Sequence, residues 1–204
     1  MPLLSLKDVY AGYADGPDVL KGVSLSLENG ECVAIVGVNG SGKSTLLRVI
    51  AGLCKPRKGI VTYTGKSNPA FLLQNPKQQM LCGTVREEIE YSMVMNYPDE
   101  PDLDGRVHAQ LMRFGLQDRA DLPPASLSGG QQQKLALAAL LCREPELLLL
   151  DEPDSFLDGR SRSEFRSFLF SNFRAGIVWI VSRINELPPN ARGLRLQSGT
   201  LVEV

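Results

Sequence analysis

The residues best suited to chemistry are Gly37–Thr45, which read Gly-Val-Asn-Gly-Ser-Gly-Lys-Ser-Thr. They fit the pattern G-x-x-x-x-G-K-[S/T], in which glycines let backbone N–H groups turn inward around the phosphates of a nucleotide. In that arrangement Lys43 reaches the β- and γ-phosphates, and the Ser44 hydroxyl ligates Mg²⁺. The alternative is a tight strand-to-helix turn that matches the pattern by chance. The candidate nucleotide-binding residues of this loop are Gly37, Val38, Asn39, Gly40, Ser41, Gly42, Lys43, Ser44 and Thr45.

The elements on either side of this loop favour the functional interpretation. Residues 31–37 are mostly apolar and β-branched, which predicts a buried strand. Residues 44–53 place apolar side chains at the spacing of a helix that packs on a sheet. The N-terminus of such a helix adds a partial positive charge beside the phosphates. The sequence therefore predicts that this chain binds a nucleoside triphosphate.

A second motif is the apolar stretch Leu147–Leu150, which is followed directly by Asp151 and Glu152. A carboxylate at the C-terminal end of a parallel strand lies where the sheet opens into the ligand crevice. Asp151 is then placed to hold Mg²⁺, and Glu152 to orient or deprotonate the water that attacks the γ-phosphate. The alternative is a strand that simply ends at a polar surface. Because a phosphate-binding loop is also present, we favour the catalytic interpretation.

Bulk composition limits the class of protein. The chain has 204 residues, 43% of them hydrophobic, which is enough for one domain with its own core. A formal net charge of -1 gives no basic field for nucleic acid, so we expect no nucleic-acid partner. The start of the chain lacks the features of a signal peptide, and the apolar runs are too short to span a membrane. The four cysteines lack metal-site spacing and lie in apolar contexts, so we expect buried, reduced thiols.

Strands and helices alternate along the chain, which predicts a mostly parallel sheet covered on both faces. Two antiparallel strands joined by a turn at residues 14–18 precede the phosphate-binding loop, and residues 84–122 change to a helical period. We interpret residues 84–122 as a helical lobe inserted into a core made of residues 1–83 and 123–204. The predicted strands are 3–10, 19–27, 31–37, 60–64, 70–73, 147–150 and 177–181, with a hairpin over 194–202; further helices are predicted at 130–142 and 160–173.

A third motif is Leu-Ser-Gly-Gly-Gln at residues 127–131, a helix start with a serine N-cap and a second possible anion site. With this motif in place the chain resembles ATP-binding cassette (ABC) ATPases, the motor subunits of membrane transporters. GVNGSGKST is similar to the family's Walker A loop, LSGGQ to its signature motif, and LLLLDEP to its Walker B strand. Residues 155–158 resemble the D-loop and Gln74 the Q-loop glutamine, while Tyr13 lies where the family keeps an aromatic residue that stacks on adenine.

The resemblance implies a P-loop NTPase fold of the ABC type, with ATP and Mg²⁺ as ligands. It implies catalytic roles for Lys43, Gln74 and Glu152, and Mg²⁺ ligation by Ser44, Gln74 and Asp151. Such domains work as head-to-tail pairs, here a homodimer or a heterodimer with another ABC ATPase. The signature residues, which would contact ATP on the opposite subunit, are Ser128, Gly129, Gly130 and Gln131. Transmembrane subunits would dock at the helical lobe and the groove beside Gln74, which would hold the protein on the cytoplasmic face of the membrane.

Two features refine the resemblance. Gln74-Asn-Pro-Lys-Gln-Gln79 is similar to a stretch in the ATPases of energy-coupling-factor importers for vitamins and metal ions such as cobalt and nickel. Ser182-Arg183 stands where the family has Ser-His or Thr-His, so the histidine expected near the γ-phosphate is absent. Either Arg183 takes its place and the site hydrolyses ATP slowly, or this chain is the degenerate half of a heterodimer that hydrolyses little or no ATP. A cassette ATPase acting on DNA or ribosomes is disfavoured, because such relatives carry coiled-coil insertions or two cassettes.

Overall fold

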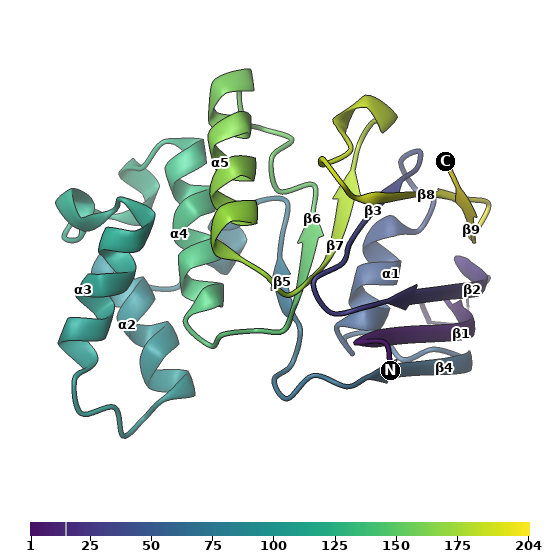
Figure 1. Cartoon of the computed structure of the whole chain (residues 1–204), viewed down its shortest axis with the longest axis horizontal. Coiled ribbons are helices and arrows are strands. Elements are labelled where there is room, and N and C mark those ends of the chain that lie inside the picture. The colour runs from purple at the N-terminus through teal and green to yellow at the C-terminus, as the bar shows by residue number, and fades with distance from the viewer. Residues whose placement is uncertain (15) are drawn as a thin grey trace.

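Two β-sheets organise the chain in the computed structural model, which describes residues 1–14 and 16–204 (Figure 1). A three-stranded antiparallel sheet has the order β2-β1-β4, and a six-stranded sheet has the order β5-β6-β7-β3-β8-β9. In the larger sheet β5, β6, β7, β3 and β8 are parallel, and only β9 runs antiparallel to its neighbour. The strands are β1 (Leu4–Ala11), β2 (Leu20–Leu27), β3 (Cys32–Val36), β4 (Lys58–Tyr63), β5 (Ala70–Leu72), β6 (Leu147–Asp151), β7 (Gly176–Val181), β8 (Arg192–Gln197) and β9 (Thr200–Glu203).

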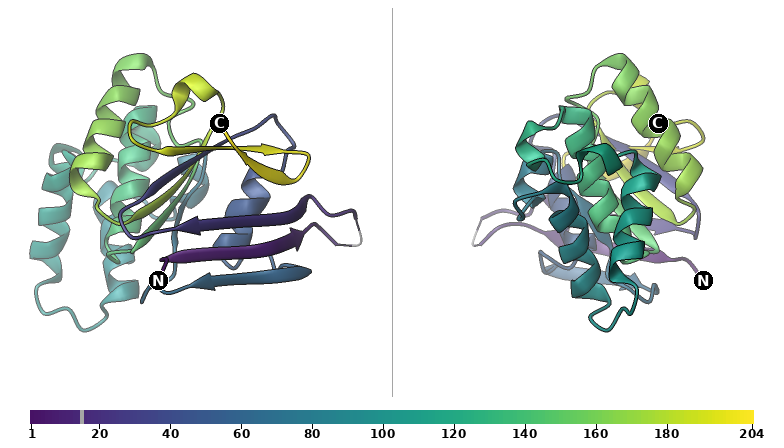
Figure 2. Two further views of the ribbon diagram at one scale, coloured as in Figure 1. Left: turned by 45° about the vertical axis from the view of Figure 1, so that its right-hand side comes forward. Right: turned by 90° about the vertical axis from the view of Figure 1, so that its left-hand side faces the viewer.

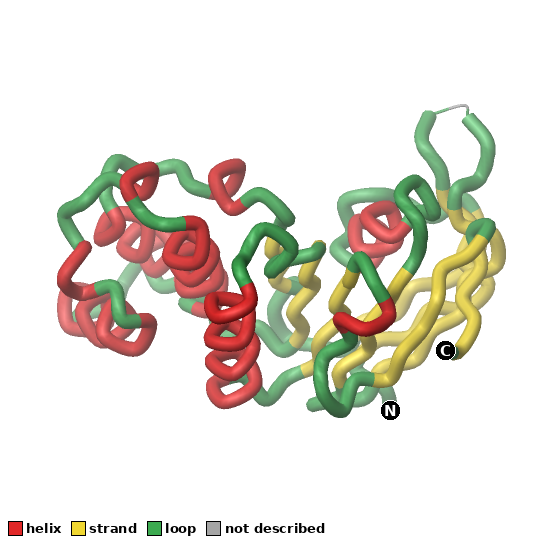
Figure 3. Tube along the Cα trace, turned by 90° about the horizontal axis from the view of Figure 1, so that it is seen from above, coloured by secondary structure: helices red, strands yellow, loops and turns green. Residues whose placement is uncertain are grey.

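The helices are α1 (Lys43–Ile50), α2 (Val85–Asn96), α3 (Leu103–Phe114), α4 (Gly129–Leu141) and α5 (Gly159–Asn172). Short 3₁₀ turns occur at Pro76–Gln79, Gln117–Arg119, Pro124–Ser126 and Ile184–Glu186. Helices α2, α3 and α4 gather at one end of the molecule, and the antiparallel strands lie at the other (Figures 2 and 3). The division into a core and an inserted lobe at residues 84–122 stays a prediction.

The core has two layers because neighbouring residues of a strand point to opposite faces of the sheet. In β6, Leu147 and Leu149 join the layer formed with α1 and the antiparallel sheet. Leu148 and Leu150 join the layer formed with helices α2–α5. Strand β7 is buried along its whole length, as expected for a parallel strand that is covered on both faces. The predicted architecture is therefore confirmed, whereas helix α1 ends at Ile50 rather than at Leu53, which is exposed.

The predicted turn at residues 14–18 includes Asp15, which lies outside the described residues. The two strands on either side of it pair antiparallel, as predicted. Predicted strand 60–64 is also confirmed, and it pairs antiparallel with β1. The only histidine, His108, is exposed on α3, away from the phosphate-binding loop.

The cysteines divide into two classes, which corrects the expectation that all four are buried. Cys32 and Cys142 are buried, whereas Cys54 and Cys82 are partly exposed. Burial raises the pKa of the Cys32 and Cys142 thiols to about 12. Partial burial and the Glu88 carboxylate also raise the pKa of the Cys82 thiol. Since the thiolate is the reactive form, we expect a thiol reagent at pH 8 to label Cys54 first, Cys82 next, and the two buried cysteines last in the native protein. Mass spectrometry of timed samples checks this, with urea-unfolded protein as the control in which all four should react.

Candidate functional site

The phosphate-binding loop connects β3 to α1, as the sequence predicts. Gly42 precedes the helix with φ +106°, and a Cβ there would lie 2.8 Å from Val19 Cγ1. Glycine is therefore required at this position on both counts. Helix α1 begins at Lys43, so the free N–H groups of its first turn face the loop. The Lys43 ammonium is nearly buried and donates hydrogen bonds to Gly37 O at 2.7 Å and Val38 O at 3.3 Å.

The two carboxylates at the end of β6 lie beside this lysine. Asp151 is the last residue of the strand, and Glu152 follows it with a positive φ of 47°. Such a backbone conformation is strained for a non-glycine residue and is concentrated at functional sites. Burial raises the pKa of the Asp151 carboxyl, while a hydrogen bond with Ser44 and the charge of Lys43 act in the opposite direction. The Glu152 carboxylate lies 3.9 Å from Lys43 Nζ.

The Glu152 carboxylate has two further partners from distant parts of the chain. Ser182, at the end of β7, donates its hydroxyl proton to Glu152 Oε2 at 2.5 Å. Gln74 Nε2, just beyond β5, donates to the same oxygen at 3.4 Å. Ends of three neighbouring parallel strands thus supply one cluster of side chains. Sequence reasoning named Gln74 and Glu152 but missed Ser182, whose type and place next to Arg183 carried no signal of this contact.

These groups line one cavity of about 570 Å³. Tyr13 lies on its wall with 48% of its surface exposed. Most of the predicted nucleotide and Mg²⁺ residues are therefore brought together around one space large enough for a small ligand. The lining residues are Tyr13, Val19, Asn39, Gly40, Gly42, Lys43, Ser44, Thr45, Gln74, Asp151, Glu152 and Ser182.

Other predicted residues do not line this cavity. Arg183 is exposed, is not part of the cavity wall, and makes no side-chain hydrogen bond or ion pair with the described residues. The signature residues form the start of α4, where Ser128 and Gln131 make a reciprocal capping box. Gly129 and Gly130 are not part of the wall of this cavity.

The stretch from Gln74 to Gln79 has a clear structural logic. The Asn75 side chain accepts a hydrogen bond from Lys77 N and caps a 3₁₀ turn that begins at Pro76. Gln79 then accepts from Leu73 N and donates to Phe71 O, both at 2.8 Å. Gln79 therefore ties the segment back to β5 and fixes the course of the chain at Gln74, just after the strand. This role of Gln79 was not predicted.

Comparison with known proteins agrees with this geometry. Residues 20–155 match the family model described as ABC transporter. The chain belongs to the ABC transporter family. Its fold is the ABC-type nucleotide-binding domain, and members of the family bind ATP and hydrolyse it for transport, so this chain is an ABC ATPase domain. The predicted family, fold and enzymatic class are thereby confirmed.

Two relatives and one solved structure show which members of the family the chain resembles. The chain is 33% identical over 196 residues to the energy-coupling factor transporter ATP-binding protein EcfA of Methanocaldococcus jannaschii, covering 89% of this chain and 70% of the relative. It is 34% identical over 197 residues to the energy-coupling factor transporter ATP-binding protein EcfA1 of Thermotoga maritima, and the match covers 92% of this chain and 76% of the relative. Among solved structures it resembles cbiO1 of Clostridium perfringens, part of the ABC transporter complex cbiONQ, with a TM-score of 0.86 and 27% sequence identity. The match covers 98% of this chain and 87% of cbiO1.

Proposed function

We propose that this ABC ATPase is the motor subunit of an energy-coupling-factor-type importer, hydrolysing Mg-ATP to drive solute transport through membrane partners. The observation that carries the proposal is the single cavity lined by Tyr13, the phosphate-binding loop and the two carboxylates. The names of the EcfA relatives and the Gln74–Gln79 stretch support the importer class.

The roles of the side chains follow from their chemistry. The loop N–H groups and Lys43 bind the phosphates, and Lys43 offsets the charge that develops on them. Glu152 orients the attacking water and accepts its proton, and Gln74 and Ser182 hold the carboxylate in place.

Mg²⁺ fits the donor set of this cavity. The Ser44 hydroxyl, the Asp151 carboxylate and the Gln74 amide oxygen are the hard ligands that this ion prefers. A nearby cation also favours the charged form of Asp151, whose burial otherwise disfavours it. When bound, Mg²⁺ would neutralise charge on the phosphate oxygens.

The exposed start of α4 supports a head-to-tail pair of ATPase subunits. Ser128, Gly129 and Gly130 would contact ATP held by the partner, which is a second copy or another ABC ATPase. A two-fold arrangement makes both such contacts at once.

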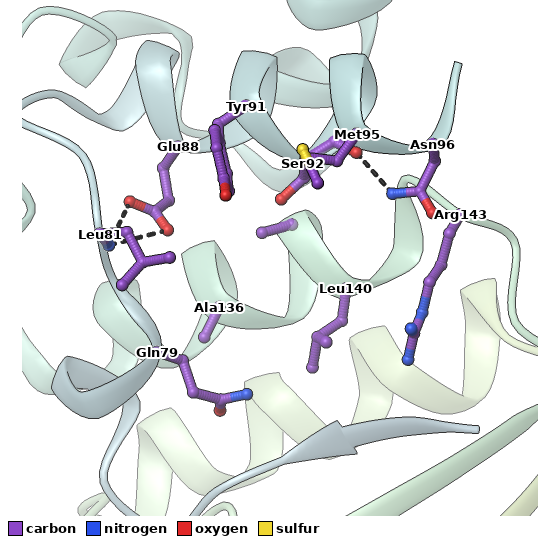
Figure 4. Close-up of a pocket in the computed structure, with 11 residues that line it drawn as sticks. Gln79, Leu81, Glu88, Tyr91, Ser92, Met95, Asn96, Ala136, Leu140 and Arg143 are labelled. Carbon is purple, nitrogen blue, oxygen red and sulfur yellow. Dashed lines mark hydrogen bonds between the residues drawn. The ribbon is translucent and has the colours of Figure 1, made fainter. Parts of the chain in front are cut away.

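A groove of about 390 Å³ between α2, α4 and the segment after Gln74 is our candidate docking site for a membrane subunit (Figure 4). Leu81 and Met95 on its wall are 73% and 65% exposed, and Arg143 lines one end. Exposed apolar side chains in a concave surface are typical of a partner contact. None of the helices in the described part of the chain is long and apolar enough to cross a bilayer itself. We place the protein on the cytoplasmic face of the membrane, held there by its partners.

Substitutions of Arg183 test whether this chain is an active motor or the degenerate half of a heterodimer. We expect measurable but slow Mg-ATP hydrolysis by the purified wild type, because an arginine can donate to phosphate with its permanent charge. Arg183→Ala should lower kcat by about 10- to 100-fold, the worth of one charge-assisted hydrogen bond. Arg183→His should retain the Mg-ATP hydrolysis that Arg183→Ala loses. Phosphate release is the measurement, with Arg174→Ala as an arginine control outside the cavity. A silent wild type that Arg183→His activates would instead support the degenerate half.

A further inference from the structure

We propose that Arg48 and Arg57 are positioning residues that hold the Tyr13 ring as a preformed platform for the nucleobase. The inference rests on the proposed function, since it assumes that ATP occupies the cavity. Neither arginine lines the cavity. Arg57 acts through the segment that carries Tyr13, and Arg48 acts through the Tyr13 hydroxyl, although its charge also opposes the rise that burial causes in the pKa of the Asp151 carboxyl.

The Tyr13 hydroxyl is fixed by two residues of helix α1. Arg48 Nη1 donates to Tyr13 Oη at 3.1 Å, and Tyr13 Oη lies 3.0 Å from Thr45 Oγ1. Because a guanidinium can only donate, the tyrosine oxygen accepts from Arg48 and its own proton is free to bond Thr45. Thr45 and Arg48 are three residues apart and therefore lie on the same face of the helix. Two directional bonds at the end of the ring restrict its swing about the side-chain torsions.

The backbone that carries the ring is fixed by Arg57, which lies between α1 and β4. Its guanidinium donates to Gly16 O at 2.8 Å and to Asp18 Oδ1 at 2.9 Å, and it also donates to Ala14 O. Gly16 N donates to Tyr13 O at 3.0 Å, which closes a turn directly after the tyrosine. Arg57 therefore holds three residues of the segment that follows Tyr13, namely Ala14, Gly16 and Asp18, against the stretch of chain between α1 and β4.

This arrangement joins two parts of the nucleotide site to one rigid element. The N-terminus of α1 begins at Lys43, beside the phosphate position, and the next turn holds the Tyr13 ring. The half-exposed ring lines the same cavity, within reach of a base whose phosphates lie on the loop. Stacking of a base on an aromatic side chain contributes binding energy whatever the identity of the base. A ring that is already held loses less freedom when the base binds, so more of this energy appears as affinity.

The test compares binding of ATP with binding of inorganic tripolyphosphate, which has the phosphates but no base. Calorimetry is performed on the wild type, Arg48→Gln, Arg57→Gln and Tyr13→Phe, with Tyr13→Ala as the reference for loss of the ring. Arg160→Gln is the matched control, because Arg160 on α5 is 90% exposed and pairs only with Glu164 among the described residues. Tripolyphosphate binding also reports whether each variant retains a folded phosphate site.

We expect Arg48→Gln, Arg57→Gln and Tyr13→Phe to weaken ATP binding by about 2- to 10-fold, the range for loss of ordinary hydrogen bonds. Tripolyphosphate affinity should not change, and in steady-state assays KM should rise more than kcat falls. Equal losses for ATP and tripolyphosphate in Arg48→Gln would overturn the inference, because the arginine would then act on the phosphates. Unchanged ATP binding in the Arg48, Arg57 and Phe variants, with a loss in Tyr13→Ala, would also overturn it while leaving the proposed function intact. A wild type that binds neither compound would overturn both.

Discussion

Replacing Glu152 with glutamine should lower steady-state Mg-ATP hydrolysis by about 10²–10⁴-fold, the usual contribution of a general base. Glutamine keeps the size of the side chain and can still accept hydrogen bonds from Ser182 and Gln74. It cannot take a proton from water, and it removes the negative charge 3.9 Å from the Lys43 ammonium. We therefore expect ATP to bind at least as tightly to the variant as to the wild type, although turnover is lost.

Phosphate release and ATP binding measured on the same preparation check this result. Glu164→Gln is the matched control, since Glu164 is an exposed acid on α5 that pairs with Arg160. Turnover within twofold of wild type in Glu152→Gln would assign the base to another group. Loss of ATP binding together with turnover would show that Glu152 organises the phosphate site rather than the water.

The strained backbone of Glu152 explains how this carboxylate reaches its place. Its positive φ turns the chain at the end of β6, and its N–H donates to Ile180 O of the neighbouring strand. The side chain is thereby aimed at Ser182, which lies at the end of that same strand. Strain held by neighbouring hydrogen bonds is one way in which an enzyme fixes a reactive group before substrate arrives.

The parts of the site that are local in sequence could be predicted, and the parts that depend on tertiary contact could not. The phosphate-binding loop and the pair Asp151 and Glu152 follow from residue types within a few positions of one another. The bond between Ser182 and Glu152 joins residues 30 positions apart, and the bond between Arg48 and Tyr13 joins residues 35 apart. Both depend on how strands and loops are placed side by side, which no short pattern encodes.

The fold shows the same division. The alternation of strands and helices along the sequence was enough to predict a mostly parallel sheet that is covered on both faces. It did not show which sheet β4 joins, because an apolar strand has no local feature that specifies the strand with which it pairs; in the structure β4 pairs with β1. Helix α1 ends three residues early, since Gly52 adopts a left-handed conformation and Leu53 N bonds Arg48 O instead of continuing the helix.

The segment after Asp151 and Glu152 is anchored by a buried ion pair. Asp154 is 5% exposed, and Arg166 of α5 donates Nε–H to its Oδ2 at 2.5 Å. The Arg166 guanidinium also lies 5.5 Å from the centre of the Trp179 ring on β7. This pair therefore connects Asp154, which directly precedes residues 155–158, to helix α5 and to strand β7.

Arg166→Leu should destabilise the protein by about 3–5 kcal/mol, because it leaves the Asp154 carboxylate buried without its partner. The loss is a large part of the total for a domain whose unfolding free energy is about 5–15 kcal/mol. Urea unfolding at neutral pH, followed by circular dichroism, measures it. Arg160→Leu, which breaks an exposed pair on the same helix, should cost no more than about 1 kcal/mol. The double variant Asp154→Leu, Arg166→Leu should recover much of the loss, because an apolar pair leaves no uncompensated charge. Equal midpoints for Arg166→Leu and Arg160→Leu would mean that Asp154 is not anchored through Arg166.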